Sequence, residues 1–214
     1  MTTKKRYQAF IAYFNQHQPE AGTELTYTNP FQLLLAVILS AQCTDKRVNR
    51  VTPALFEAFP TPIHLAHSSV EEIFPYIKSI SYPNNKTKHL FHTAKKIMKD
   101  FAGAIPEHVE DLQKLPGVGR KTAHVIASVL HKQPKLAVDT HVFRVSKRLG
   151  LADERATTPL AVEKQLVQHL PKAHIAKAHH WLILHGRYVC LSRQPKCQDC
   201  ALTSFCLYFS KTTA

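Results

Sequence analysis

Hydrophobic residues recur along most of the chain three or four positions apart, which is the spacing of amphipathic helices. No stretch alternates apolar and polar residues convincingly enough to indicate a strand, and prolines fall mostly between the periodic segments. We therefore expect an all-α protein. The expected helices lie at about 30–41, 45–58, 69–78, 85–100, 108–115, 119–131, 141–149, 159–169 and 173–189, after a first helix with Tyr7, Phe10, Ile11 and Phe14 on one face.

The helix expected at 30–41 is apolar on nearly every face, so it belongs at the centre of a core. Asn29 and Pro30 form its start signal, an N-cap residue followed by proline at the first helical position. The run PFQLLLAVILSA contains Gln32 and is shorter than the roughly 20 apolar residues that a membrane span needs. No apolar region follows the basic residues of MTTKKRYQAF, so no signal peptide is indicated. We expect a soluble, intracellular protein.

The net charge of +13 is concentrated in two segments. Residues 76–99 hold six lysines and no acid, and residues 112–150 hold eight basic residues and one acid, Asp139. The remainder of the chain carries equal numbers of basic and acidic residues. Such clustering favours a polyanion-binding surface over a merely solvated basic face, because counter-ions are released when lysine and arginine neutralise a phosphate backbone.

A glycine turn, LPGVGRKTA, lies inside the second basic segment. It is not a P-loop, because Gly117 and Gly119 are only two positions apart, and it is not a dinucleotide fingerprint, because Thr122 replaces the third glycine and no strand precedes it. What remains is a helix, a short hairpin and a helix. The backbone N–H groups of Gly117, Val118, Gly119 and Arg120 are candidates to hold one DNA phosphate without reading bases. A plain turn between core helices is the alternative.

Lys121 stands in the first turn of the following helix, beside Arg120. The positive end of a helix disfavours an ammonium group, and only a neutral amine is a nucleophile. Asp139, the single acid of the basic segment, follows an apolar stretch in KLAVDTHVFRV and is placed to cap the next helix. Lys121 and Asp139 are therefore candidates for a catalytic pair, and a phosphate contact for Lys121 and a purely structural cap for Asp139 remain open at this point.

Four of the five cysteines lie in a tail with the spacing C-x6-C-x2-C-x5-C. In an intracellular protein this density indicates a metal site rather than two disulfides, and the spacing alone leaves zinc and a 4Fe–4S cluster both open. The loop between the first two cysteines also carries Arg193 and Lys196, which are candidate phosphate contacts, whereas Cys43 is expected to be an inert, half-buried thiol. The expected ligands are Cys190, Cys197, Cys200 and Cys206.

Taken together, LPGVGRKTA, VDTHVFRV, HHWLILHGRYVC, FQLLLAVILSAQCTD and the cysteine tail resemble the helix–hairpin–helix DNA glycosylase superfamily, specifically its endonuclease III family, over essentially the whole chain. The resemblance implies two helical domains flanking a DNA-binding cleft. Residues 23–133 would form the central domain, which ends in the hairpin. Residues 1–22 and 134–214 would form the second, with a 4Fe–4S cluster in the loop at 190–206 and zinc as the less favoured metal.

The resemblance also implies a reaction. An oxidised pyrimidine is flipped out of duplex DNA, Lys121 attacks its anomeric carbon with help from Asp139, and a Schiff base forms. Beta-elimination then nicks the strand at the abasic site. Gln42 matches the residue that fills the gap left by the flipped base. Tyr82, in SYPNNKT where the family usually has G-L-Y-N-x-K-A, would be the wedge and would stack on the orphaned base, which leaves the lesion preference open.

The expected partner is double-stranded DNA with damaged pyrimidines or abasic sites, bound by a monomeric enzyme in the cytoplasm at the nucleoid. Two other functions remain open at this point: a monofunctional or mismatch glycosylase, and a non-catalytic, metal-stapled DNA-binding protein. His179, His180 and His185, around Trp181, are expected to serve packing or backbone hydrogen bonding rather than metal binding.

Overall fold

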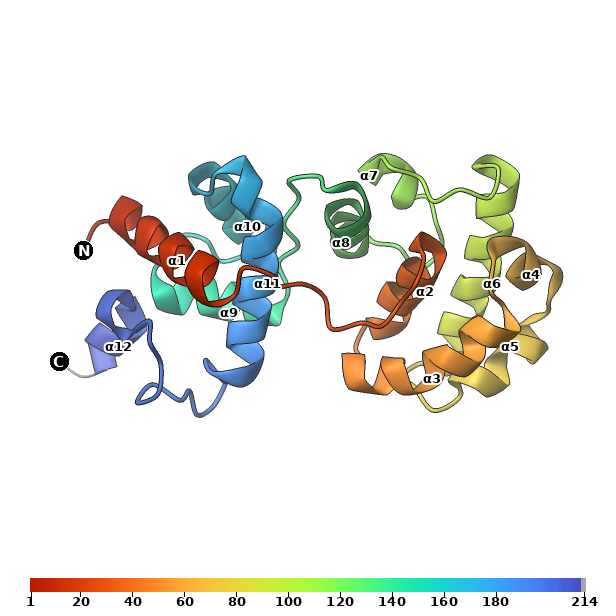
Figure 1. Cartoon of the computed structure of the whole chain (residues 1–214), viewed down its shortest axis with the longest axis horizontal. Coiled ribbons are helices and arrows are strands. Elements are labelled where there is room, and N and C mark those ends of the chain that lie inside the picture. Colours follow the sequence, from red (N-terminus) through yellow and green to blue (C-terminus); the bar gives the residue numbers. More distant parts are fainter. Residues whose placement is uncertain (213–214) are drawn as a thin grey trace. The chain divides into compact units, whose positions relative to one another are not determined.

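The computed structural model describes residues 1–212, and this part of the chain folds into helices and loops with no strand (Figure 1). The prediction of an all-α fold is therefore confirmed. The chain divides into two compact units, Glu24–His131 on the one hand and Met1–Thr23 with Lys132–Ala214 on the other. Among the helices of residues 1–212, none is long and apolar enough to cross a membrane.

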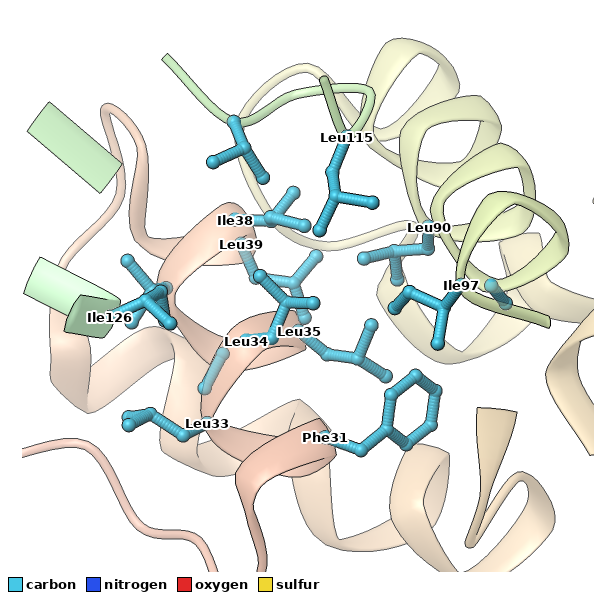
Figure 2. Close-up of a cluster of buried hydrophobic side chains, with 14 of the residues drawn as sticks. Phe31, Leu33, Leu34, Leu35, Ile38, Leu39, Leu90, Ile97, Leu115 and Ile126 are labelled. Atoms are coloured by element: carbon cyan, nitrogen blue, oxygen red, sulfur yellow. The ribbon is translucent and has the colours of Figure 1, made fainter. Parts of the chain in front are cut away.

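The first unit is built around α2, which spans Pro30–Ser40. Its side chains are buried from Leu33 to Leu39 without interruption, and it packs against α3, α6 and α8. Figure 2 shows Leu90 and Ile97 of α6 on one side of this helix and Ile126 of α8 on another. The other helices of this unit are α3 (Asp45–Ala58), α4 (Pro62–His67), α5 (Val70–Ile77), α6 (Pro83–Asp100), α7 (Val109–Leu112) and α8 (Arg120–His131).

The start of α2 follows the expected signal, since the side chain of Asn29 accepts a hydrogen bond from the N–H of Gln32. Helix α4 was not among the expected elements. It has six residues and buries only Leu65, so hydrophobic periodicity cannot reveal it. Helix α7 is shorter than the range 108–115 that the pattern predicts.

In the second unit, α1 supplies an aromatic face as expected. Phe14 stacks on Trp181 with ring centroids 5.5 Å apart, Phe10 meets the same indole edge-on at 5.8 Å, and Trp181 Nε1 donates to the carbonyl of Gln18 at 2.8 Å. The helices of this unit are α1 (Thr3–His17), α9 (Thr140–Leu149), α10 (Pro159–His169), α11 (Lys172–Tyr188), the 3-10 turn η1 (Thr203–Phe205) and α12 (Leu207–Thr212).

Helices α9 and α11 approach each other closely at Gly186. A Cβ atom placed there would lie 2.9 Å from Cβ of His141, so any larger residue would push the helices apart. This contact holds together the helix that begins at the predicted catalytic aspartate, α9, and the helix that ends at the cysteine loop, α11.

The histidines of α11 lie inside this unit. His179 forms a 2.9 Å hydrogen bond between its Nδ1 and the carbonyl of Ala137, and its ring meets that of His180 edge-on. Burial lowers the pKa of His180 from 6.5 to about 3, and the positive charges of His179, Arg187 and Lys132 act in the same direction. These residues therefore belong to packing and backbone hydrogen bonding.

Because the folded state keeps His180 neutral, the fold should weaken in acid. Below about pH 6.5 the unfolded chain binds a proton that the folded chain excludes until about pH 3, so this contribution is complete above pH 6.5 and is lost as the pH falls. Between pH 7 and pH 5 we expect a loss of about 2 kcal/mol of unfolding free energy from His180. Urea unfolding at both pH values measures it. His180→Gln should remove this share of the pH dependence, and an unchanged dependence would contradict the assignment.

Candidate functional site

The glycine turn connects α7 to α8 and is anchored in the core of its unit. Val118 is 5% exposed, and its N–H donates to the carbonyl of Leu115 at 3.1 Å. Thr93 of α6 donates its hydroxyl to the carbonyl of Pro116 at 2.8 Å. The side chain of Val118 is thus buried and its N–H, one of the four predicted phosphate donors, is already bonded within the turn, so Val118 does not serve as the donor that the sequence suggested.

The two glycines of the turn have different constraints. Gly117 has a φ of +77°, and a Cβ atom there would lie 2.9 Å from the imidazole of His89. Around Gly119 no atom lies within 4 Å of the Cβ position, so a side chain has room. The turn therefore requires glycine at position 117, whereas no contact within the fold requires glycine at position 119.

Helix α8 begins beyond Gly119, whose carbonyl accepts the N–H of Ala123 at 2.9 Å. The first N–H groups of any α-helix lack a carbonyl partner within the helix, and together with the dipole they attract an anion. Lys121 lies on the exposed side of the first turn, opposite the buried face that includes Ile126. Its ammonium or amine group is thus presented at the same helix end as the candidate phosphate site.

Asp139 belongs to the second unit and is the N-cap of α9. Its Oδ1 accepts the N–H of Val142 at 2.8 Å, so the expected cap is present. The carboxylate is half-buried and follows the buried residues Leu136 and Ala137, whose backbone His179 holds. A carboxylate fixed in this way keeps a defined direction without a salt bridge.

Gln42 and Tyr82, the predicted gap-filling and wedge residues, both lie in the first unit on exposed loops. Gln42 follows the C-cap of α2 with a φ of 53°, and Tyr82 is the N-cap of α6 with a φ of 55° and a side chain 62% exposed. Non-glycine residues in the left-handed region are uncommon, and they concentrate at functional sites.

Several basic residues of the charged segments are used inside the protein, which charge counting did not reveal. Arg144 donates to the carbonyls of Gly186 and Cys190 at 2.9 and 3.2 Å, and Arg148 donates to those of Leu191 and Ser192 at 2.6 and 2.8 Å. The two arginines are one helical turn apart on α9, so the sequence does indicate that they lie on the same face of that helix. It does not indicate that this face contacts backbone carbonyls of the protein. They hold the start of the cysteine loop.

The four tail cysteines are free thiols, and Cys200 and Cys206 lie close enough to Cys190 and Cys197 for their charges to interact. Burial raises the pKa of Cys200 and Cys206 above the ordinary value, and the negative charge of Cys190 and Cys197 raises both further. Within residues 1–212, no three histidine, cysteine or acidic side chains are arranged closely enough to hold a metal ion.

The surroundings of these thiols nevertheless suit a negatively charged cluster. Arg148 Nη1 lies 3.4 Å from Cys190 Sγ, and the N–H of Phe209 donates to Cys206 Sγ at 3.5 Å. Cationic and N–H donors to sulfur are typical of thiolate ligands. Arg193 and Lys196 are exposed on the loop between the first two cysteines, and Cys43, elsewhere in the chain, is half-buried as expected.

Both the sequence and the fold of this chain are similar to those of known proteins. The model of the HhH-GPD superfamily of base excision DNA repair proteins matches residues 35–172. Endonuclease III of Rickettsia prowazekii (strain Madrid E) is 46% identical over 199 residues, 93% of each chain, and that of Bacillus subtilis (strain 168) is 47% identical over 188 residues, 88% of this chain and 85% of that one. A solved structure of a trapped covalent intermediate between endonuclease III and DNA has a TM-score of 0.92 and 41% identity, with 100% of both chains covered.

The two glycines of the turn give a matched pair of variants. Gly117→Ala should destabilise the protein by about 1–2 kcal/mol or more, because alanine is strained at positive φ and its methyl group meets His89. Gly119→Ala should change stability by no more than about 0.5 kcal/mol. If a phosphate approaches Gly119, the same variant should weaken binding to duplex DNA by about tenfold. Urea unfolding and fluorescence anisotropy measure the two effects. Unchanged DNA affinity of Gly119→Ala would rule out that contact.

Proposed function

This chain belongs to the endonuclease III family within the HhH-GPD superfamily of base excision DNA repair proteins, and we propose that it excises oxidised pyrimidines through Lys121 and Asp139. Its class of reaction follows from the family: it is a DNA glycosylase that is also an abasic-site lyase. The observation that carries the residue assignment is the exposed position of Lys121 in the first turn of α8, directly after the hairpin.

Lys121 is the nucleophile. Its neutral Nζ attacks the anomeric carbon of the damaged nucleotide, the bond from that carbon to the base breaks, and the base leaves with the bonding electrons. Loss of a proton from nitrogen and opening of the sugar ring give a Schiff base between Lys121 and the sugar. Removal of a proton from the adjacent carbon then expels the 3′ phosphate, and water later releases the enzyme. A covalent endonuclease III–DNA intermediate has been trapped in a related structure, which supports this route.

Asp139 assists base release. Its Oδ1 is committed to the N–H of Val142, and this bond fixes the direction of the other carboxylate oxygen. An ionised carboxylate in a fixed position stabilises the positive charge that develops on the sugar as the base departs. The N-cap position of α9 thus serves both the helix and the reaction.

Some of the proposed contacts are to DNA phosphates and others are to the base stack. The backbone around Gly117 and Gly119, with Arg120, binds a phosphate, and Arg193 and Lys196 bind another. Gln42 fills the gap left by the flipped base, and Tyr82 wedges against its former partner. The two compact units are proposed to be the two domains that flank the DNA. The enzyme acts as a monomer on duplex DNA with damaged pyrimidines or abasic sites, in the cytoplasm at the nucleoid.

A 4Fe–4S cluster is the proposed cofactor, held by Cys190, Cys197, Cys200 and Cys206. Bound there, the cluster supplies four metal–thiolate bonds that cross-link the loop at 190–206. Arg148 and the N–H of Phe209 offset the negative charge of the ligands. These bonds would hold the loop in one conformation, in which Arg193 and Lys196 contact a DNA phosphate.

The covalent step is tested by borohydride trapping on duplexes with an oxidised pyrimidine or an abasic site. The wild-type protein should form a stable protein–DNA adduct, and Lys121→Ala should form none because the amine that makes the Schiff base is absent. No adduct from the wild-type protein on either substrate would overturn the proposed chemistry.

Asp139→Asn is the matched variant for this test. It should slow base release by about two orders of magnitude or more, since one charge-stabilising group is lost, while duplex binding changes little. It should still be trapped on a preformed abasic site, because Lys121 is intact. Base release without strand cleavage would instead indicate a monofunctional glycosylase. Binding with neither reaction would indicate a non-catalytic DNA-binding protein.

The cofactor is tested on the native protein. It should be brown, with broad visible absorption and four iron atoms per chain. Cys200→Ser should lose most of the colour, whereas Cys43→Ser, which changes the cysteine outside the tail, should keep it. A colourless native protein loaded with zinc would contradict the iron–sulfur assignment.

A further inference from the structure

Lys86 is a buried lysine that the proposed chemistry does not use. It lies in the first turn of α6, its side chain is 5% exposed, and lysine is almost never so buried without a partner. Its Nζ donates to the carbonyl of Leu39 at 2.8 Å and to that of Ala41 at 2.6 Å. Burial lowers the pKa of Lys86, and the nearby Cys43 thiolate opposes that shift.

The two carbonyls belong to the C-terminal end of α2. The last carbonyls of a helix have no partner within the helix and form its negative end, so an ammonium group there is stabilised by both hydrogen bonds and the dipole. Figure 2 places Leu39 in the same core as Leu90, which is one turn beyond Lys86 on α6. The ammonium group therefore closes the end of α2 from a neighbouring helix.

The residue after Ala41 is Gln42, whose φ is 53°. The backbone N–H of Lys86 in turn donates to the carbonyl of Tyr82 at 3.1 Å, and the φ of Tyr82 is 55°. The bond to Tyr82 is the regular i to i−4 bond at the start of α6, whereas the bonds of the Lys86 side chain cross to the end of α2. The side chain of Lys86 therefore ties the start of α6, next to Tyr82, to the end of α2, next to Gln42. Within residues 1–212, Gln42 and Tyr82 are half of the four non-glycine residues with positive φ, the others being Ala102 and Lys132.

A second bond connects the same two loops. Arg47, in the first turn of α3, donates through Nε and Nη2 to the carbonyl of Ser79 at 3.0 and 2.7 Å. Ser79 lies just before Tyr82, and α3 begins just after Gln42. Left-handed backbone of this kind persists only where the surroundings determine it. The side chains of Lys86 and Arg47 bond to backbone carbonyls one to three residues away from Gln42 and Tyr82.

We propose that Lys86 is a positioning residue that fixes the backbones of Gln42 and Tyr82 together, so that filling the gap and wedging the opposite base occur as one movement. This inference rests on the proposed function, which assigns those two roles. Because Lys86 is buried, it is assigned no contact with DNA or with the reacting atoms, and it acts through the two loops.

Lys86→Met tests this, because methionine keeps the length of the side chain and removes its three donors. Single-turnover base release from a damaged duplex should fall by about tenfold to a hundredfold, as expected when reacting groups are displaced by about 1 Å. Cleavage at a preformed abasic site in single-stranded DNA needs neither gap filling nor a wedge, and it should stay within about twofold. Lys164→Met, on the exposed side of α10, is the matched control.

A non-additivity experiment separates positioning from general stability. In a Gln42→Ala/Tyr82→Ala background, Lys86→Met should slow base release by less than about twofold further, because the groups through which it acts are gone. An equal loss in both backgrounds, or an equal loss on both substrates, would show a merely structural role and overturn the proposal.

Arg47→Met keeps the test decisive if Lys86→Met does not fold, since Arg47 is exposed. It should show the same pattern with a smaller loss of about threefold, and again none in the double-alanine background. A wild-type protein that neither releases a base nor forms an adduct would overturn the proposed function. An active wild type with an equally active Lys86→Met would overturn only the role of Lys86.

Discussion

Every α-helix leaves its first N–H groups and its last carbonyls without partners in the helix, and this requirement organises the protein. Asp139 satisfies the start of α9, Lys86 satisfies the end of α2, and Arg144 satisfies the end of α11. The start of α8, next to Lys121, is where we propose that a DNA phosphate binds. Polar groups that fold the chain and polar groups proposed to act on DNA are therefore neighbours at the same helix ends, or the same groups.

The residues at these helix ends also differ in how freely they can change. Gly117 is fixed by its own φ and by His89, so its identity belongs to the fold. Gly119 has open space around it, and Lys121 and Tyr82 project outward. Residues that the fold leaves unconstrained, yet which stand beside rigid backbone, are the natural carriers of substrate preference. Tyr82 is such a position, since its backbone is held while its ring is exposed.

Much of this arrangement was predictable because it is local in sequence. The cap and proline at Asn29 and Pro30, the cap at Asp139 and the helix–hairpin–helix itself depend on residues within a few positions of one another. The resemblance to a known family then added the roles of Lys121 and Asp139, which remain a prediction. Helix α4 was not predicted because six residues are too few to show a helical hydrophobic period.

What could not be predicted depends on contacts between distant segments. The lack of room for a side chain at Gly117 depends on a histidine of another helix, and the burial of Lys86 depends on carbonyls of α2. Counting charges treated Lys86, Arg144 and Arg148 as part of a polyanion surface, whereas their hydrogen bonds lie within the protein. A positive charge in a sequence does not reveal whether its partner is a ligand or a carbonyl elsewhere in the chain.

The aromatic contacts of α1 have a consequence for synthesis on the ribosome. Phe10 and Phe14 pack against Trp181, and the carbonyl of Gln18 accepts the indole N–H of Trp181, which lies 163 positions later in the chain. All of Glu24–His131 is made in between, so every residue of that unit's core has been synthesised while α1 still lacks its partners. At about 5–20 residues per second, the apolar face of α1 stays unburied for roughly ten to thirty seconds. Helix α1 is thus made before the unit Glu24–His131 and finds its partners after it.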